Sequence, residues 1–282
     1  MNIVTVTITR LGNKYLREFI EYYKNLGVDK MFFYDNNHED EENIMDVVSD
    51  YVESGFVEVV DFRNERGRLQ EMAYQDFYEK HGNDYDWYGI FDDDEYVVLL
   101  DGSTNIKEFV SKDIFADKNG IAFPMINFCD TNVIVNNKNT RLDVYTEVMD
   151  PNNLYHHSFY KTMVRGGLNI QYKDAMANGE KYNEGCHIPF IDGIVGKGIV
   201  DCDGNDVRSD KFSFITQYAT KNAFLKHIPT GSIDDYINMK RKRGWPDTNS
   251  DMNNKFNLDY FSWYNNLTPE KILYYKLKTE QI

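Results

Sequence analysis

The stretch Ile3-Val-Thr-Val-Thr-Ile8, and the stretch Asn13-Lys-Tyr-Leu-Arg-Glu-Phe-Ile-Glu-Tyr-Tyr-Lys-Asn-Leu26 after it, decide the fold of this chain. The β-branched residues of the first stretch are typical of a strand. The second stretch repeats its apolar residues at helical spacing, and Gly27 stands where the left-handed cap of a helix belongs. The chain therefore opens with a strand and then a helix.

The same alternation continues through the first ninety residues. Short apolar runs predict three more strands, and amphipathic patterns predict two more helices, which Gly55 and Gly82 close. The strands are expected at Met31–Tyr34, Phe56–Phe62 and Trp87–Phe91, and the helices at Glu41–Ser54 and Arg68–His81. This order indicates an α/β fold whose mostly parallel sheet is flanked by helices. Such sheets bind ligands at the carboxyl ends of their strands.

Beyond residue 100 the alternation loosens. We expect helices over Ile106–Phe115 and Ser232–Arg243, strands over Gly120–Phe128 and Phe159–Val164, and loops with one hairpin over Gly179–Arg208. The last helix ends in the basic cluster Lys240-Arg-Lys-Arg243, and an aromatic amphipathic tail follows it. The patterns predict one domain over residues 1–245, divided into halves at about residue 100, and a helical extension over residues 246–282.

The composition limits the possible functions. The 282 residues carry 31 basic and 46 acidic side chains, a net charge of −15, which argues against a nucleic-acid binder. Aromatic residues make up 15% of the chain, which excludes a disordered acidic protein. Cys129, Cys186 and Cys202 form no C-x-x-C pair, which favours free thiols. No signal peptide and no membrane-spanning apolar run is visible, so we expect a soluble, cytoplasmic protein.

Four consecutive carboxylates, Asp92-Asp-Asp-Glu95, directly follow the fourth expected strand. Adjacent negative charges repel one another and resist burial unless a cation compensates them. On an extended backbone Asp92 and Asp94 point the same way, and their oxygens are suitable ligands for Mg²⁺ or Mn²⁺. A solvated acidic turn is the alternative interpretation. Because the run stands at the ligand-binding edge of the sheet, we favour a metal site.

Three other polar segments are candidates for binding. Asp35 could accept hydrogen bonds from a base or a ribose, or could form an Asx turn. In Arg66-Gly-Arg-Leu-Gln70, the arginines could meet a phosphate or pair with neighbouring glutamates. Asp201-Cys-Asp-Gly-Asn-Asp206 resembles the start of a calcium loop, but Phe212 at its twelfth position is no carboxylate. We therefore expect a hairpin turn at Asp203-Gly204.

Familiar catalytic motifs are missing from the sequence. The chain has no P-loop, no G-x-G-x-x-G, no G-x-S-x-G and no H-E-x-x-H. These absences exclude the common NTPase, dinucleotide-binding, serine-hydrolase and zinc-protease classes. The histidine pair His156-His157 and the lone His187 do not by themselves indicate a site.

Several blocks, in order along the chain, resemble the glycosyltransferase family 92 and family 2 group. The stretch Tyr15–Asn36 is similar to its N-terminal signature, and Phe91-Asp-Asp-Asp-Glu-Tyr96 to its D-x-D-E-F block. Tyr160-Lys-Thr-Met-Val-Arg165 resembles its K-[ST]-hydrophobic-V-R strand, and His187-Ile-Pro189 resembles a later His block. The stretches Ile215–Lys221 and Tyr236–Gly244 resemble its closing pattern, H-Y-x-[ST]-K-S … K-x-x-R-G.

This resemblance implies a GT-A fold, with its nucleotide-binding half before residue 100 and its acceptor-binding half after. It implies transfer of a sugar from a nucleotide-diphosphate donor, expected to be a UDP-sugar, to a glycan or lipid-linked glycan. Asp92 and Asp94 would hold a divalent ion on the diphosphate, and this ion and basic side chains would stabilise the departing charge. The predicted donor-binding residues are Thr7, Arg10, Asp35, Arg66, Gln70, Asp92, Asp93, Lys221 and Arg243.

The chain departs from the family pattern in two places. The first loop reads Arg10-Leu-Gly-Asn13 where the family often has Lys-Asn-Glu. Gln217 stands where the closing His commonly completes metal coordination. The Gln carbonyl could still bind a hard cation, or His187 could substitute for it. This replacement motivates an alternative function, a non-catalytic nucleotide- or sugar-binding module.

The mechanism that the resemblance implies is inverting. A carboxylate base would take the proton of the acceptor hydroxyl, and Asp130 and Asp192 are the two candidates, between which the sequence does not choose. The product would be a bacterial surface polysaccharide. The aromatic tail is expected to pack on the domain or on a second subunit. The alternative is peripheral contact with the inner membrane, where lipid-linked acceptors reside.

Overall fold

The structure is a computed structural model that describes residues 1–63, 65–129, 132–149, 159–172, 187–207, 220–244 and 257–279. Its strands are β1 (Ile3–Thr9), β2 (Lys30–Asp35), β3 (Val57–Asp61), β4 (Trp87–Ile90), β5 (Glu95–Leu99), β6 (Gly120–Cys129), β7 (Glu147–Val148), β8 (Tyr160–Arg165), β9 (Ile170–Gln171), β10 (Phe190–Ile191), β11 (Ile194–Val195), β12 (Ile199–Asp201) and β13 (Ala223–His227). Its helices are α1 (Asn13–Asn25), α2 (Met45–Glu53), α3 (Leu69–His81), α4 (Ile106–Val110), α5 (Ile233–Asp235), α6 (Leu258–Tyr264) and α7 (Pro269–Thr279). A 3₁₀ turn, η1 (Asp113–Phe115), follows α4, and a π-helix, η4 (Tyr236–Arg241), continues α5.

The predicted alternation of strands and helices in the first ninety residues is confirmed. The seven elements β1 to β4 and α1 to α3 appear in the expected order. Only α2 differs clearly, because it begins at Met45 and not at Glu41. The glutamates ahead of it bind the loop after β1: Glu41 pairs with Arg10, and Glu42 accepts the backbone N–H of Asn13. These contacts hold the segment away from a helical path.

The main sheet has the strand order β3-β2-β1-β4-β8-β6-β13-β5. The first four strands of this order are mutually parallel, β8 is antiparallel to both of its neighbours, β13 is parallel to β6, and β5 is antiparallel to β13. The predicted α/β fold class is confirmed. This topology brings the carboxyl ends of β1, β2, β4, β6 and β13 to one edge, where β5 and β8 begin.

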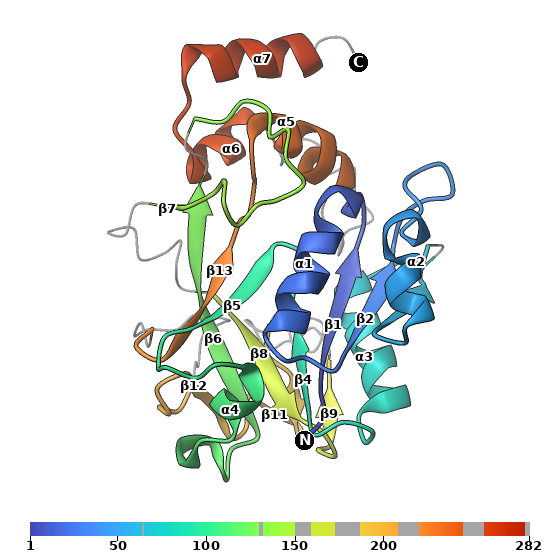
Figure 1. Ribbon diagram of the computed structural model, residues 1–282, viewed down its shortest axis with the longest axis vertical. Helices are drawn as coiled ribbons and strands as arrows, with labels where there is room; N and C mark the ends of the chain where they lie inside the picture. The colour runs from blue at the N-terminus through green and yellow to red at the C-terminus, as the bar shows by residue number, and fades with distance from the viewer. Residues whose placement is uncertain are drawn as a thin grey trace.

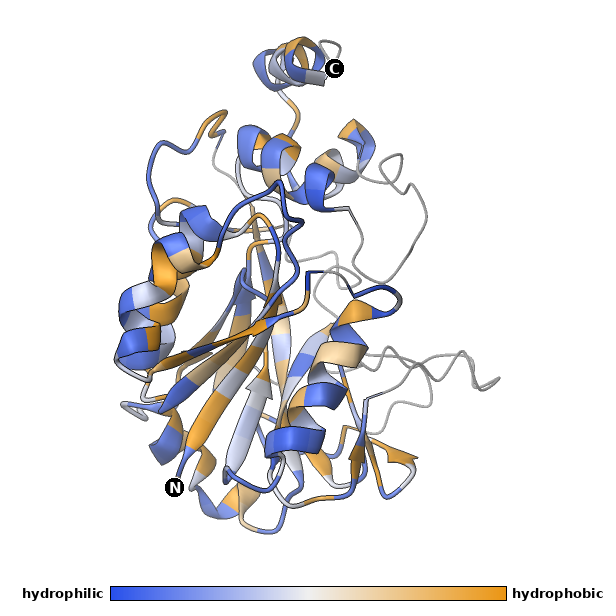
Figure 2. Cartoon of the chain, turned by 90° about the vertical axis from the view of Figure 1, so that its right-hand side faces the viewer, coloured by the Kyte–Doolittle hydropathy of each residue, from blue (hydrophilic) through white to orange (hydrophobic). Residues whose placement is uncertain are grey.

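Helices cover both faces of this sheet (Figures 1 and 2). Alternate residues of a strand point to opposite faces, so each strand contributes to two cores. On one side Ile3 and Phe33 join the apolar faces of α1 and α2, and on the other Val6 and Phe32 pack with Tyr74 of α3. The two apolar layers fix the strand ends relative to one another and so fix the edge at which they meet.

The second half of the chain departs further from the predictions. The helix expected over Ile106–Phe115 is split into α4 and η1, because Lys112 between them takes an extended conformation. The turn expected at Asp203-Gly204 is confirmed, since the Gly204 N–H donates to the Asp201 carbonyl at 3.0 Å and Gly204 has φ +89°. Strands β13 and β5, which end the main sheet on one side, were not predicted.

The C-terminal helices lie at the edge where the strands end, at the top of Figure 1. Ile233, Tyr236, Ile237 and Phe261 form a separate small core that joins α5 and η4 to α6. The helix expected over Ser232–Arg243 is present as α5 and η4, and most of it is a π-helix. No helix in the described part of the chain is long and apolar enough to cross a membrane. The domain boundary at residue 245, membrane contact and oligomerisation stay predictions.

Candidate functional site

The four carboxylates form the tight connection between β4 and β5. The Glu95 N–H donates to the Asp92 carbonyl at 3.1 Å, and the Asp92 N–H donates to the Glu95 carboxylate at 2.8 Å. Asp93 and Asp94 are each 3% exposed, and Glu95 is 1% exposed. The alternative of a solvated acidic turn does not fit this burial. Buried carboxylates need compensating charge, and the surrounding elements supply it.

Both oxygens of Asp92 are engaged by protein groups. Oδ1 accepts hydrogen bonds from Gln70 Nε2 at 3.0 Å and from the Tyr74 hydroxyl at 3.4 Å. Oδ2 lies 3.1 Å from Nζ of Lys161, a buried residue at the start of β8. Burial raises the pKa of Asp92, but the Lys161 ammonium and His187 together leave the pKa lowered. Asp92 is therefore an ionised side chain whose orientation the protein already fixes.

Asp93 points toward the loop after β1. Its Oδ2 accepts a hydrogen bond from the Thr9 hydroxyl at 2.6 Å, and its Oδ1 lies 3.4 Å from Arg243 Nη1. The buried Arg141 donates to its backbone carbonyl at 2.7 Å. The loop passes so close that a Cβ on Gly12 would come within 2.6 Å of Asp93 Oδ2. Glycine is thus required at position 12 for this packing.

Asp94 faces groups that suit a metal site. His227 Nε2 lies 3.7 Å from its Oδ1, and Lys240 Nζ lies 3.8 Å from its Oδ2. The ligand atoms of Asp94, Glu95 and His227 all lie within 4.8 Å of one another. Burial lowers the pKa of His227 to about 4, so its imidazole is neutral near pH 7 and can offer a lone pair.

Asn127 on β6 orients the His227 ring. Its side-chain oxygen lies 2.6 Å from His227 Nδ1. If Nδ1 carries the proton and donates it there, the lone pair is on Nε2, the nitrogen that faces Asp94. Burial also raises the pKa of Glu95 well above its usual value, and Asp92 and Asp94 oppose the effect of Lys161.

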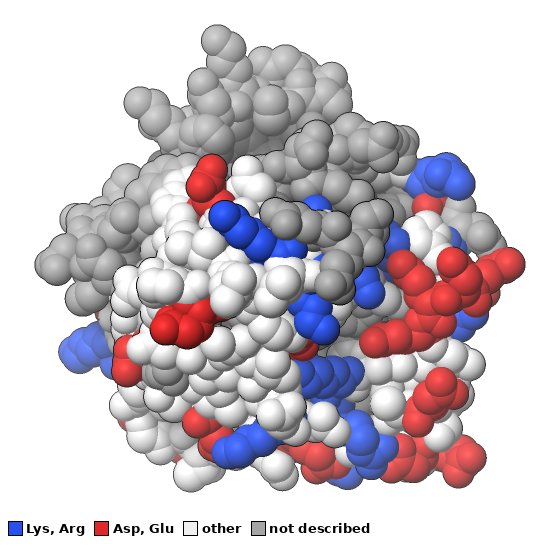
Figure 3. All heavy atoms as spheres, turned by 90° about the horizontal axis from the view of Figure 1, so that it is seen from above, with Lys and Arg blue, Asp and Glu red and all other residues white. Residues whose placement is uncertain are grey.

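The edge of the sheet brings together several residues that the sequence predicted. Gln70 contacts Asp92 and Arg243 contacts Asp93, while Asp94 beside them faces Lys240. Seen from this end, Figure 3 shows Lys and Arg side chains through the middle of the face and most of the visible Asp and Glu side chains toward its right and lower margins, with a few on the left. The basic groups thus gather at this edge although the chain as a whole is acidic.

Three other predicted residues lie at the same edge, and two of them have protein partners. The Asp35 carboxylate accepts two hydrogen bonds from Arg63, at 2.9 and 3.0 Å, and two from Asn37, one of them from its backbone N–H at 3.1 Å as in an Asx turn. Arg10 pairs with Glu41 and also donates to the Arg243 carbonyl at 3.4 Å. The Thr7 hydroxyl is buried and has no hydrogen-bond partner within the described ranges.

The remaining predicted residues are not brought to Asp94. Lys221 is exposed before the first residue of β13, the opposite end from His227, roughly 20 Å away along an extended strand. Asp192 is exposed in the turn between β10 and β11 and pairs with Lys197. Arg66 is exposed ahead of α3, and His187 lies near the start of β8, where its Nδ1 is 2.7 Å from the Tyr160 carbonyl. Asp130, Gln217 and Cys186 lie outside the described residues.

His227 is the site residue that the sequence analysis missed. A usable signal was present, because His227, Thr230 and Ser232 have the spacing H-x-x-[ST]-x-S, and Lys240 and Arg243 follow with the spacing K-x-x-R-G. The closing His of the family pattern was matched to Gln217, and His227 was therefore not identified. The structure places His227 at the carboxyl end of β13, opposite Glu95 in the register.

Comparison with known proteins gives a family match. The model for glycosyltransferase family 92 matches residues 4–201, more than half of the chain. No curated protein sequence matches the chain. The crystal structure of S. aureus TarS 1-349 is similar at 10% identity and a TM-score of 0.41, covering 86% of this chain and 64% of that chain. TarS 1-349 in complex with UDP-GlcNAc is similar at 11% identity and a TM-score of 0.35, covering 58% and 45%.

Proposed function

The chain belongs to glycosyltransferase family 92, and from that premise we propose that it moves a sugar from a nucleotide-diphosphate donor, a UDP-sugar, to a glycan acceptor. The observation that carries the proposal is the arrangement of Asp94 and the neutral His227 beside the cations Lys240 and Arg243. A diphosphate needs positive charge as the sugar departs, and this edge of the sheet supplies it.

A divalent ion fits the side chains at this edge. One carboxylate oxygen and one neutral imidazole nitrogen are ligands that Mn²⁺ accepts, and Mg²⁺ would use the oxygens. We propose Asp94 and His227 as the ligands, with Glu95 beside them and Asn127 holding the imidazole. When bound, the ion would act as a Lewis acid on the diphosphate. Because Lys161, Gln70 and Tyr74 engage both oxygens of Asp92, we propose a donor contact and not ligation for this residue.

The donor would lie across the ends of β1, β2 and β4. We propose that Asp35, with the Arg63 guanidinium it holds, and Arg10 face the nucleoside, while Asp92 and Gln70 face the sugar or ribose. Arg243, whose guanidinium lies 3.4 Å from Asp93, would bind the diphosphate. Contacts from Thr7, Arg66 and Lys221 stay predictions, as does metal ligation by Gln217 or His187.

We propose inverting transfer, as the family resemblance implies. A carboxylate base would accept the proton of the acceptor hydroxyl as its oxygen attacks the sugar. Asp130 remains a candidate for this base. Asp192 is the weaker candidate, because its carboxylate is exposed and pairs with Lys197. The non-catalytic alternative rested on a missing closing His, and His227 supplies a histidine at this position of the site.

Turnover of a donor tests the proposal. Incubation with a panel of UDP-sugars and Mn²⁺ should release UDP, and EDTA should abolish the release. Asp94→Asn should lower the rate by about a hundredfold or more, because it removes the charge that faces His227. Asp117→Asn, at an exposed carboxylate remote from the edge, is the control and should keep the native rate. Release that EDTA and Asp94→Asn both leave intact would reject the metal site.

A further inference from the structure

The basic side chains around the acidic run come from a distant part of the chain. Lys240 lies on the π-helix η4 and Arg243 lies just beyond its end, yet they reach Asp94 and Asp93, which are about 150 residues earlier. Lys240 is 20% exposed on its side chain and Asp94 only 5%. A π-helix is rare and is frequently found at functional sites.

The position of Lys240 conflicts with that of a metal ion on Asp94. The two oxygens of Asp94 face two different groups: Oδ1 faces His227 Nε2 at 3.7 Å, and Oδ2 faces Lys240 Nζ at 3.8 Å. An ion bound between Asp94 and His227 would lie within a few ångströms of the ammonium, and two cations at such a distance repel each other strongly away from bulk water. A diphosphate would remove the conflict by giving the ammonium another partner.

We propose that the Lys240 ammonium pairs with the Asp94 carboxylate before a donor binds. When the metal ion and the donor bind, the ammonium leaves Asp94 and pairs with the donor diphosphate. This inference rests on the proposed function. Lys240 therefore opposes binding of the metal alone and favours binding of the metal together with the diphosphate. Metal binding then depends on donor binding, which protects the acidic site from cations when no substrate is present.

The structure allows this exchange without unfolding the helix. The start of the helix is anchored, because the Asp235 carboxylate accepts hydrogen bonds from Lys14, Tyr15 and Tyr145. Lys240 is more than one turn beyond this anchor, and its four-carbon side chain can swing while the backbone stays in place. Gly244, with φ +69°, ends the segment.

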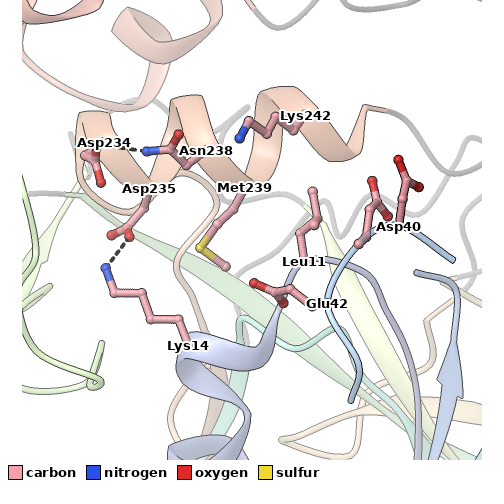
Figure 4. Close-up of a pocket in the computed structure, with 10 residues that line it drawn as sticks. Leu11, Lys14, Asp40, Glu42, Asp234, Asp235, Asn238, Met239 and Lys242 are labelled. Carbon is pink, nitrogen blue, oxygen red and sulfur yellow. Dashed lines mark hydrogen bonds and ion pairs between the residues drawn. The ribbon is translucent and has the colours of Figure 1, made fainter. Parts of the chain in front are cut away.

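Lys242 on the same segment provides a matched control. Its side chain lines a cavity of about 470 Å³ together with Leu11, Met239 and Asp40 (Figure 4). The cavity lies between η4 and the loops that follow β1 and β2. Lys242 is exposed, and no contact between it and the acidic run is found within the described residues. It carries the same charge as Lys240 but faces another surface.

Titration of the full chain with Mn²⁺, with and without saturating UDP, tests the inference. Native protein should bind Mn²⁺ weakly alone and far more tightly with UDP. Lys240→Met should bind Mn²⁺ alone about tenfold more tightly than native protein and should lose most of the gain from UDP. Lys240→Arg, which keeps the charge, and Lys242→Met should both resemble native protein. Thermal melts establish that each variant is folded, and Lys240→Gln replaces Lys240→Met if that variant does not fold.

The outcomes separate this inference from the proposed function. Equal affinities of native protein and Lys240→Met for Mn²⁺ alone would overturn the role of Lys240 and leave the metal site standing. Tighter binding by Lys242→Met as well would also overturn it, since the effect would then be one of net charge. Failure of every protein to bind Mn²⁺ even with UDP would reject the metal site and the inference with it.

Discussion

At the residue scale, neighbouring carboxylates of one short run have different partners. Asp92 is held by Gln70, Tyr74 and Lys161, whereas Asp94 faces His227 and Lys240 at distances too long for hydrogen bonds. The sequence predicted that the run binds a cation, because four adjacent carboxylates need one. It could not separate Asp92 from Asp94, because the partners that distinguish them come from distant segments.

The ammonium of Lys161 should be essential for stability. It is 1% exposed and lies 3.1 Å from Asp92 and 3.9 Å from Glu95. Lys161→Met leaves these carboxylates without their nearest cation and should lower the free energy of unfolding by about 3 kcal/mol. Urea denaturation measures the change. Lys197→Met, which breaks an exposed pair with Asp192, should cause little change, and an equal loss in both variants would contradict this account.

At the element scale, the π-helix is the feature that the sequence could not specify. A helix was predicted over Ser232–Arg243, and both ends of the helical segment are close to those expected. A π-helix and an α-helix differ by one residue per hydrogen-bonded turn, and no residue pattern distinguishes them over six residues. Strands β5 and β13 were missed because each is only five residues long. In addition, β5 begins within the acidic run, and β13 follows shortly after the block that ends at Lys221.

The anchor of this helix should make stability depend on pH. Burial raises the pKa of Asp235, but Lys14, Tyr15 and Tyr145 outweigh it, so the folded-state pKa lies below the usual value. The ionised carboxylate therefore contributes stability above the unfolded-state pKa, and this contribution is lost as the pH falls through the folded-state pKa.

Asp235→Asn tests this pH dependence. At pH 7 the free energy of unfolding of the variant should be about 3 kcal/mol lower than that of native protein, because Lys14 loses its buried partner. The difference should shrink as the pH is lowered through the acid range in which native Asp235 becomes protonated. Chemical denaturation at a series of pH values measures both quantities. A difference that stays constant down to acid pH would mean that the carboxylate charge is not responsible.

At the scale of the whole molecule, the fold is what brings the site together. The alternation of the first ninety residues predicted the parallel half of the sheet and the edge at which its strands end, because this information is local. The pairing of β13 with β6 and β5 joins segments that are far apart in the sequence. This pairing places His227 next to Asp94. The net charge of −15 likewise did not reveal that basic side chains from the end of the chain gather at this edge.

The central claim is that Asp94 and His227 bind a divalent ion together with a nucleotide diphosphate. Calorimetric titration of UDP into the full chain, in Mn²⁺ and in EDTA, tests it most directly. We predict that Mn²⁺ raises the affinity for UDP by about tenfold or more in native protein and in Asp117→Asn, and that the gain disappears in Asp94→Asn. UDP binding that is equal in Mn²⁺ and EDTA, or a gain that survives in Asp94→Asn, would contradict the claim.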